Sequence, residues 1–370
     1  MELIKEIMDV CNIFGIEGDL TSVETLRDGH INTTNVAVVN DGGVFKKYLV
    51  QGINTHVFKY PDKLMDNVVG VTSFLREKIE ENGGDPDRET LSFLPAKDGK
   101  YYYFYNDKCW RVYRYIDDAY TINIIKNASV FENAGRSFGR FQKNLSGYPM
   151  ESLYETIKDF HNTPKRLDNL KASVAADVKK RAAEVQPEID FALAREADTK
   201  VILKLYRDGL IPLRVTHNDT KLNNILFDKN TKESICVIDL DTIMPGFSLY
   251  DFGDAIRFGA NTAAEDEKNL DKVQLSLPLF ESFTRGFLST CATALTKAEV
   301  KHLAFGAKMM TYECGIRFLA DYLDGDVYFK IRYDDHNLVR ARNQFKLVEE
   351  MEKHMDEMNE IVDRIYKEFV

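Results

Sequence analysis

A change in hydrophobic periodicity near residue 118 constrains the fold more than any other feature of this sequence. Before it, short β-branched segments are separated by turn signals such as Asp28-Gly29 and Asp41-Gly42-Gly43, which predicts antiparallel strands and a hairpin. After it, apolar residues recur at spacings of three and four, which predicts helices. The sequence therefore predicts an α+β fold with two unequal lobes. A small antiparallel sheet lies in residues 1–117, and a larger, mostly helical lobe follows over residues 118–370.

The same periodicity predicts individual helices. In the small lobe, one main helix is predicted to begin at Pro61, because the apolar positions after it recur at helical spacing: Leu64, Val68, Val71, Leu75 and Ile79. The N-terminal stretch MELIKEIMDVCNIFGI mixes acidic and apolar residues, so we predict a short amphipathic helix there and not a signal peptide. In the larger lobe, helices are predicted over residues 130–147, 151–160, 168–185, 189–207 and 351–369.

The composition argues against several classes of protein. A net charge of −10 opposes binding to nucleic acid, which needs a clustered basic surface. No apolar run approaches the roughly 18 residues that span a bilayer, so no membrane segment is predicted. The five cysteines are scattered and form no C-x-x-C pair, which indicates reduced thiols and no zinc site. Together these features predict a soluble cytoplasmic protein.

The most informative stretch follows Thr216, where polar residues lead into two apolar segments. Ile225–Phe227 and Ile235–Ile238 are predicted to pair as antiparallel strands, so that Asn224 and Asp239 meet at the open end of the hairpin. An amide oxygen beside a carboxylate suits Mg²⁺, which takes hard oxygen ligands and further oxygens from a substrate phosphate. We therefore predict Asn224 and Asp239 as metal ligands.

The segment before the hairpin contains four polar residues at a spacing that is typical of a catalytic loop. His217, Asp219, Lys221 and Asn224 form the pattern H-x-D-x-K-x-x-N, which resembles the catalytic loop of protein kinases. In such a loop the aspartate orients the attacking hydroxyl or accepts its proton, so Asp219 is the predicted catalytic base. His217 is predicted to hold nearby backbone. Lys221 either neutralises the transferring phosphoryl group or is simply solvated, and the sequence leaves both open.

A literal Asp-Phe-Gly triplet occurs at residues 251–253, and in protein kinases this triplet marks a metal-binding aspartate. Here it lies well past the predicted hairpin, after the turn at Pro245-Gly246. Asp239 therefore has the better geometry for a metal. Asp251 is predicted to be a buried buttress that accepts hydrogen bonds from backbone near Asp219.

Beyond these motifs, nearly the whole chain resembles the aminoglycoside phosphotransferase and choline kinase superfamily, and within it the N-acetylhexosamine 1-kinases. The resemblance is carried by THNDTKLNNILFD, VIDLDTIMPGFSLYDFGDAIRFGA, WRVYRYID, FHNTPKR, QPEIDF, MTYECGIRFLADYLDGDVYF and Asp28–Thr34. It implies a protein-kinase-like fold and an enzyme that uses ATP and Mg²⁺ to phosphorylate the anomeric hydroxyl of GlcNAc or GalNAc. By the same resemblance Asp219 is the base, Asn224 and Asp239 are Mg²⁺ ligands, and Asp241 is a second acid near the metals.

The resemblance also implies the binding residues. Those for the nucleotide are Gly29, Asn32, Thr33, Thr34, Tyr113 and Tyr115. Those for the sugar are His30, Phe258, Arg317 and Tyr328. One position departs from the superfamily pattern, because the third strand carries Gln51 where a lysine would contact the nucleotide phosphates. We expect backbone amides and Mg²⁺ to anchor the phosphates in its place.

Several alternatives remain open at this level. Arg317 can pair with Asp321, four residues along the same helix, instead of contacting a sugar. The substrate can be another small hydroxylated molecule, such as an amino alcohol or an aminoglycoside. The missing lysine also permits a catalytically silent module that only binds sugar or nucleotide. The sequence does not decide between GlcNAc and GalNAc, nor does it give the oligomeric state.

Overall fold

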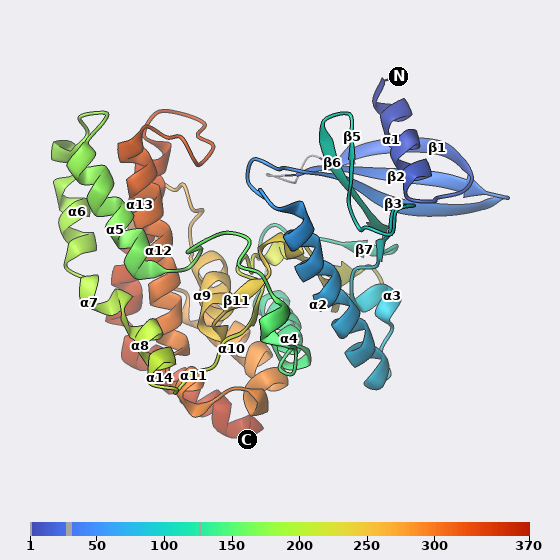
Figure 1. The fold of residues 1–370 in the computed structure, drawn as a ribbon. Coiled ribbons are helices and arrows are strands. Elements are labelled where there is room, and N and C mark those ends of the chain that lie inside the picture. The colour runs from blue at the N-terminus through green and yellow to red at the C-terminus, as the bar shows by residue number, and fades with distance from the viewer. Residues whose placement is uncertain (1, 27–31, 126) are drawn as a thin grey trace. The chain divides into compact units, whose positions relative to one another are not determined.

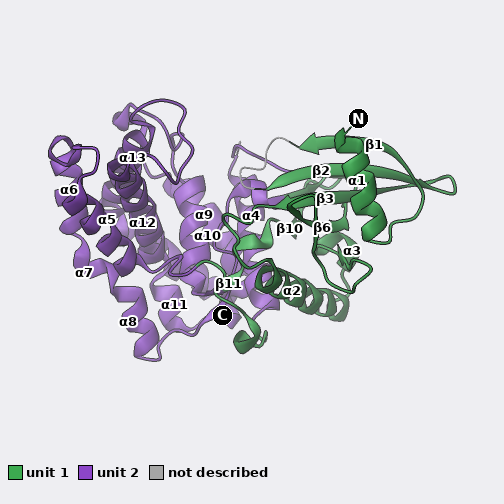
Figure 2. Ribbon diagram, turned by 45° about the horizontal axis from the view of Figure 1, so that its top comes forward, with its two compact units in different colours: residues 1–120, 147–157, 226–244 green, residues 121–146, 158–225, 245–370 purple. Residues whose placement is uncertain are grey.

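A computed structural model describes residues 2–26, 32–125 and 127–370 of the chain. Antiparallel strands dominate the first third and helices the rest, so the predicted α+β class is confirmed (Figure 1). The chain forms two compact units, which Figure 2 colours separately. Unit 1 comprises residues 1–120, 147–157 and 226–244, and unit 2 comprises residues 121–146, 158–225 and 245–370.

Unit 1 is built on an antiparallel sheet of six strands. Its main path is β1 (Asp19–Leu26), β2 (Thr33–Asp41), β3 (Val44–Ile53), β6 (Lys108–Arg114) and β4 (Phe93–Leu94), and β5 (Tyr103–Tyr105) pairs with β6. The turn between β2 and β3 has φ values of 59° at Gly42 and 96° at Gly43. Positive φ at both central residues is what a tight two-residue hairpin requires, so the hairpin predicted from Asp41-Gly42-Gly43 is confirmed.

Helices complete unit 1. The predicted N-terminal helix is confirmed as α1 (Glu2–Ile13), whose Ile7, Val10 and Cys11 are buried in a core shared with the sheet. The predicted main helix is confirmed as α2 (Pro61–Glu81), and all five apolar positions of its predicted stripe are buried. Burying side chains of this size stabilises the fold by roughly 1.5–3 kcal/mol each. A short helix, α3 (Pro86–Glu89), follows.

The predicted hairpin after residue 224 is also present. A three-stranded sheet has the order β10–β9–β7, made of β7 (Ala119–Tyr120), β9 (Ile225–Asp228) and β10 (Ser234–Val237). Asn224 ends the short 3-10 helix η3 (Leu222–Asn224) directly before β9. Asp239 follows β10 and begins the 3-10 helix η4 (Leu240–Thr242). Asn224 thus directly precedes the hairpin in the sequence, and Asp239 follows it.

Unit 2 is mostly helical. Its central helix is α12 (Leu303–Asp324), which is buried along most of its length. The other long helices are α4 (Ala128–Asn144), α5 (Thr163–Ala176), α9 (Ser248–Gly259), α10 (Leu277–Cys291), α13 (His336–Lys353) and α14 (Met355–Phe369). Shorter elements are η2 (Ala182–Val185), α6 (Gln186–Leu193), α7 (Glu196–Thr199), α8 (Val201–Arg207), β8 (Arg214–Thr216), η5 (Leu270–Lys272), η6 (Ala292–Ala294) and α11 (Lys297–Lys301). The strand β11 (Met244–Gly246) leads into α9.

The helix predicted over residues 151–160 is wrong, because only η1 (Met150–Ser152) forms there. Asn67 of α2 supplies the physical reason. Its side chain accepts the N–H of Tyr154 at 2.8 Å and donates to the carbonyl of Tyr154 at 2.8 Å. These two bonds satisfy the peptide polar groups of Tyr154 without a helix.

The other predicted helices of unit 2 exist, but several boundaries differ. The helix predicted over 168–185 begins at Thr163 and ends at Ala176, where Asp177 adopts a left-handed φ of 38°. The region 189–207 holds three short helices, and the region 351–369 is broken at His354 between α13 and α14. Boundaries of this kind depend on single backbone angles, which apolar periodicity does not report.

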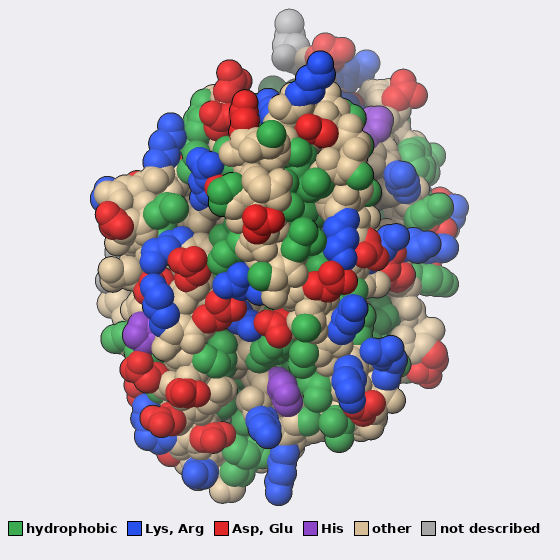
Figure 3. Space-filling view, turned by 90° about the vertical axis from the view of Figure 1, so that its left-hand side faces the viewer, with side chains coloured by type: hydrophobic (Ala, Val, Ile, Leu, Met, Phe, Trp, Pro, Cys, Tyr) green, Lys and Arg blue, Asp and Glu red, His purple; other side chains and the backbone are tan. Residues whose placement is uncertain are grey.

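Two further observations concern the surface. Among the described residues, no helix combines the length and the apolar character that crossing a membrane requires. On the face shown in Figure 3, Lys and Arg side chains are interspersed with Asp and Glu side chains. That face therefore displays no clustered basic surface of the kind that binds nucleic-acid phosphates.

Candidate active site

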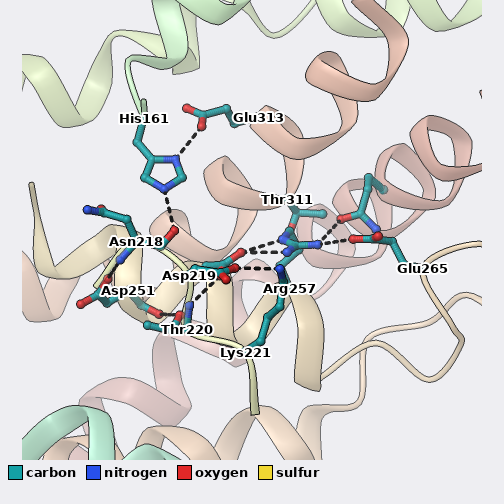
Figure 4. A network of polar contacts seen from close by, with 12 residues as sticks. His161, Asn218, Asp219, Thr220, Lys221, Asp251, Arg257, Glu265, Thr311 and Glu313 are labelled. Carbon is teal, nitrogen blue, oxygen red and sulfur yellow. Dashed lines mark hydrogen bonds and ion pairs between the residues drawn. The ribbon is translucent and has the colours of Figure 1, made fainter. Parts of the chain in front are cut away.

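The predicted catalytic loop joins β8 to η3 in unit 2. The carboxylate of Asp219 lies 2.8 Å from the ammonium of Lys221 and keeps 28% of its side-chain surface exposed (Figure 4). Asn224 donates from its amide nitrogen to the Asp219 carboxylate at 3.1 Å and to the Asp219 carbonyl at 2.8 Å. Because the nitrogen of this amide is turned toward Asp219, its oxygen is turned away and is the atom that can meet a cation.

The electrostatics of the loop keep Asp219 ionised. Burial raises the pKa of Asp219, but the positive charge of Lys221 and its hydrogen bond outweigh this effect and hold the pKa below the ordinary value of 3.8. The pKa of Lys221 is raised in return, first by the charge of Asp219. A carboxylate that stays charged at neutral pH, with part of its surface exposed, can accept a hydrogen bond from a hydroxyl group and orient it.

Asp251 holds the catalytic loop through hydrogen bonds to its backbone. Its carboxylate accepts the backbone N–H of His217 at 3.0 Å and that of Asn218 at 2.8 Å, and the amide of Gln142 donates to it at 2.7 Å. The side chain is 1% exposed. The predicted role of Asp251 as a buried buttress is therefore confirmed. His217 is fully buried, and its Nδ1 accepts the N–H of Asp219 at 3.2 Å, which confirms its predicted backbone-holding role.

The remainder of the Asp-Phe-Gly triplet is also structural. It lies in the first half of α9, where a Cβ on Gly253 would be 2.5 Å from the carbonyl oxygen of Gly306 in α12. Gly253 thus allows the backbones of two helices to touch. The next residue of α9, Asp254, lies one turn after Asp251 and accepts the N–H of Thr220 at 2.9 Å. The helix therefore carries two carboxylates that hold the catalytic loop through its backbone.

A second group of residues reaches the loop from α5 and α12. His161 contacts Glu313 at 2.7 Å through Nδ1 and the carbonyl oxygen of Asn218 at 3.3 Å through Nε2, as Figure 4 shows. The other oxygen of Glu313 accepts the hydroxyl of Thr163 at 2.7 Å. Burial raises the pKa of Glu313, but the nearby His161 and Arg317 outweigh it and the net shift is downward. Glu313 is thus an ionised carboxylate with both oxygens engaged.

Arg317 lies one helical turn after Glu313. Its guanidinium is 5.4 Å from the ring centroid of Phe160, 6.0 Å from that of Tyr328 and 5.6 Å from that of Phe329. Arg166 donates to the carbonyl of Phe160 at 2.8 Å, and its pKa is lowered by burial and then by the charge of Arg317. Unit 2 therefore presents two arginines and aromatic rings beside the loop that carries Asp219.

The alternative in which Arg317 pairs with Asp321 is wrong. One oxygen of Asp321 accepts the backbone N–H groups of Val327 at 3.0 Å and Tyr328 at 2.8 Å, and the other accepts that of Phe329 at 3.0 Å. Asp321 thus holds the loop after α12 and brings two aromatic rings to Arg317. Tyr328 is 64% exposed on this loop.

In unit 1, two of the residues predicted for the nucleotide, Asn32 and Thr34, belong to a polar network that includes Asp241. Asp241 forms an ion pair with Arg111 at 2.5 Å and accepts from the amide of Asn32 at 2.5 Å. Gln51 accepts from the Nε of Arg111 at 2.8 Å and donates to the hydroxyl of Thr34 at 2.8 Å. Both oxygens of Asp241 are thereby engaged, which is not what a second metal-binding acid needs.

The remaining predicted residues are placed as follows. Thr33 is exposed at the start of β2, and Tyr113 is buried in β6, where its ring packs 4.9 Å from that of Phe93. The backbone N–H of Tyr115 donates to the backbone carbonyl of Lys47 at 3.1 Å. Phe258 is half-buried on α9. Gly29 and His30 lie outside the described residues.

The donor set can be tested against Mg²⁺. Among the described residues, no group of three or more His, Cys, Asp or Glu side chains is arranged to hold a metal. Mg²⁺ does not need one, because it is usually held by one or two protein oxygens, water and substrate phosphates. The carboxylate of Asp239 in unit 1 and the turned oxygen of Asn224 in unit 2 are each hard oxygen donors of the kind that Mg²⁺ takes, so both remain predicted ligands.

Sequence reasoning missed four residues that the structure brings to these sites: Arg111, His161, Arg166 and Glu313. One of them had a visible signal. Arg111 lies between Trp110 and Val112 in an apolar strand, and a charge in such a strand has to be buried with a partner. Glu313 gave a weaker signal as an acid within an apolar helix. His161 and Arg166 gave none, because their partners are remote in sequence.

Comparisons with known proteins concern a family match and the fold. Residues 98–278 match the model of the phosphotransferase enzyme family, APH. Among solved structures, the chain is similar to a microcompartment-associated aminopropanol kinase, with 15% identity and a TM-score of 0.56 over 96% of this chain and 98% of that one. It is similar to a choline kinase from Cryptosporidium parvum, with 15% identity and a TM-score of 0.55 over 98% and 99%.

A third similar structure is a spectinomycin phosphotransferase in complex with ADP and spectinomycin, with 12% identity and a TM-score of 0.52 over 98% of each chain. At such identities the likeness establishes the fold, and it does so over nearly the whole chain. The predicted kinase-like fold is therefore confirmed. Over residues 98–278, just under half of its length, the chain matches the phosphotransferase enzyme family model, and its fold is that of the similar aminopropanol and choline kinase structures.

Proposed function

We propose that this phosphotransferase is an ATP-dependent sugar 1-kinase, which transfers the γ-phosphate of ATP to the anomeric hydroxyl of GlcNAc or GalNAc. The products are the N-acetylhexosamine 1-phosphate and ADP. In the reaction, the anomeric oxygen forms a bond to the γ-phosphorus and the bond from that phosphorus to the β,γ-bridging oxygen breaks. The hydroxyl proton passes to the carboxylate of Asp219.

Each side chain has a defined task in this proposal. Asp219 orients the anomeric hydroxyl, and its ion pair with Lys221 keeps it ionised until the proton arrives. Asn224 and Asp239 hold Mg²⁺, which when bound neutralises charge on the transferring phosphate. Arg317 and Tyr328 bind the hydroxyl and acetamido groups of the sugar. Thr33 and Thr34 at the start of β2, together with Tyr113 and Tyr115, are the nucleotide residues of the proposal.

The choice of substrate in this proposal rests on the positive charges of Arg166 and Arg317. Choline and aminopropanol, which name the substrates of two similar structures, each contain a positively charged nitrogen. Such an acceptor is bound by carboxylates or aromatic faces and is repelled by nearby cations, whereas Arg166 and Arg317 are both cationic. In the part of the chain that the structure describes, neither guanidinium forms a salt bridge with a carboxylate, and Glu313 already accepts from His161 and Thr163. This arrangement favours an uncharged acceptor rich in hydroxyl and carbonyl oxygens.

The deciding experiment measures ADP release with a panel of acceptors. The panel contains GlcNAc, GalNAc, glucose, choline, aminopropanol and an aminoglycoside, each with Mg²⁺ and ATP, and Asp219→Asn serves as the inactive control. We expect turnover with at least one N-acetylhexosamine. ³¹P and ¹H NMR should show coupling between phosphorus and the anomeric proton.

Three outcomes would overturn this proposal in whole or in part. Turnover of a cationic acceptor alone would promote the amino alcohol or aminoglycoside kinase. ADP binding without turnover of any acceptor would point to a silent binding module. Phosphate on C6 of the sugar would keep a sugar kinase but reject the anomeric position.

A further inference from the structure

Arg111 and Asp241 form a buried ion pair within unit 1. Their side chains are 3% and 4% exposed, and their charged atoms lie 2.5 Å apart although 130 positions separate them in the sequence. A buried charge needs a partner, and removal of one member leaves the other uncompensated. The pair therefore joins strand β6 firmly to the turn after β10.

The pair is extended on both sides by amide groups. Gln51 of β3 accepts two N–H bonds from Arg111, at 2.8 Å from Nε and 2.6 Å from Nη2. On the other side, the amide nitrogen of Asn32 donates at 2.5 Å to the carboxylate oxygen of Asp241 that Arg111 does not contact. The amide oxygen of Asn32 accepts the N–H of Asn54 at 2.9 Å. Residues from the segment before β2 and from β6 thus converge on one carboxylate, and Gln51 of β3 holds the arginine.

Asp241 lies two residues after Asp239. The intervening turn begins with Asp239 in the left-handed region, at φ 59° and ψ 57°. A residue other than glycine persists in this region only when its surroundings hold it there. The carboxylate of Asp241 ties that turn to the sheet, because both of its oxygens are engaged by residues of the sheet or its edge.

We propose that Arg111 is a positioning residue, which acts through Asp241 to hold Asp239 in the conformation that binds the nucleotide-associated divalent cation. This inference rests on the proposed function only in that Asp239 is taken as a metal ligand. Arg111 itself does not meet the phosphates, since its guanidinium is buried and faces Gln51 and Asp241. Gln51, at the position of the expected lysine, serves to orient this arginine.

The rival explanation is that Asp241 is itself a metal ligand, and the two explanations predict opposite signs. If Asp241 binds the cation, removing Arg111 frees a carboxylate and strengthens cation binding. If Arg111 positions Asp239, removing Arg111 weakens cation binding. Residues that orient metal ligands typically contribute 10–100-fold to metal affinity.

The experiment measures Mn²⁺ binding in the presence of ADP by electron paramagnetic resonance, which needs no acceptor and no turnover. We expect Arg111→Gln and Asp241→Asn each to weaken Mn²⁺ binding by about 10-fold or more, with Arg111→Lys intermediate. The double variant Arg111→Met with Asp241→Leu replaces the pair by apolar groups and keeps the fold testable if a single variant does not fold. It should weaken binding to the same extent as the singles, because the same tie is lost.

The matched control is Arg88→Gln. Arg88 of α3 also pairs with an aspartate of the hairpin, Asp228, at 2.7 Å, but at a position remote in sequence from Asp239. It should leave Mn²⁺ binding within about twofold of the wild type. Stronger binding in Arg111→Gln, or unchanged binding in the double variant, would overturn the inference. Failure of the sugar panel alone would not affect it, because Mn²⁺ and ADP are the only probes.

Discussion

Glu313 and His161 are joined by a contact of 2.7 Å between Oε1 and Nδ1, across 152 positions of sequence. The other ring nitrogen of His161 meets the backbone carbonyl of Asn218, the residue before Asp219. A carboxylate and a carbonyl are both acceptors, so the two contacts together need a hydrogen on each ring nitrogen. The pair therefore ties the position of the catalytic loop to helix α12.

The first prediction concerns this tie. Changing His161 to Ala removes the partner of a buried carboxylate, which costs about 3–5 kcal/mol when a buried pair is broken. We expect a lower melting temperature and a lower kcat, because Asn218 and hence Asp219 lose a support. His161→Gln should recover part of kcat, since its amide can still donate to one acceptor. Equal kcat for wild type and His161→Ala would contradict the role in positioning.

The second prediction concerns the base. Asp219→Asn should lower kcat by roughly 10²–10⁴-fold while the melting temperature changes little, because general bases contribute about that much and the side chain is similar in shape. Steady-state kinetics and a thermal melt together check this. More than a tenth of the wild-type kcat in Asp219→Asn would defeat the assignment.

The third prediction concerns pH. The pKa of Asp219 is depressed below 3.8, because the charge of Lys221 and its hydrogen bond outweigh the effect of burial. The ionised form, and the stability from its ion pair, are therefore present above that pH and lost only as the pH falls through the depressed value. We therefore expect that titration of Asp219 does not lower kcat/KM between about pH 5 and 8.

Lys221→Met should move the acid limb of that profile upward, because the largest opposing charge is gone. Lys204→Met is the matched control, since Lys204 of α8 pairs with Asp208 just after that helix and not with the loop. An unchanged acid limb in Lys221→Met would show that another group controls it.

The fourth prediction separates the two aspartates that sequence motifs offer for the metal. Asp239→Ala should abolish Mg²⁺-dependent turnover with a small change in melting temperature. Asp251→Ala should mainly destabilise the protein, because two backbone N–H groups and Gln142 lose their acceptor, at about 1–3 kcal/mol for each buried group left unpaired. Activity assays and denaturant melts on both variants check this, and the reverse pattern would make the literal Asp-Phe-Gly triplet the functional one.

The fifth prediction concerns the acceptor. Arg317→Ala should raise the KM for the sugar about 10-fold, the value expected for a lost hydrogen bond to a charged group, and leave the KM for ATP nearly constant. Asp321→Asn should have a smaller effect of the same kind, because the loop that carries Tyr328 is held less firmly. Arg285→Ala on the surface of α10 is the control, and a rise in the KM for ATP instead would place Arg317 elsewhere in the reaction.

Some features could be predicted because their cause lies within a few residues. The hairpin at Gly42-Gly43 follows from backbone angles that glycine adopts easily, and α2 follows from Pro61 and a regular apolar stripe. The buttress role of Asp251 followed from chain order alone, because the Asp-Phe-Gly triplet comes too late to belong to the hairpin. Residue type and spacing suffice in each of these cases.

Other features could not be predicted, because their cause lies far away in the sequence. The segment 151–160 has helical residues but is held open by Asn67, and Asp321 has the right spacing for Arg317 but binds a loop instead. Helical spacing states which residues can meet, and it does not state which competing partner wins.

The sequence by itself determined the α+β class, the catalytic-loop spacing around Asp219 and the hairpin between Asn224 and Asp239. These depend on local backbone preferences and on short-range periodicity. Only the tertiary structure decided that Asp241 is held by Arg111 and that His161 and Glu313 support the loop. The reason is physical: a buried charge takes whichever partner the packed fold brings within hydrogen-bond distance, and that partner can come from any part of the chain.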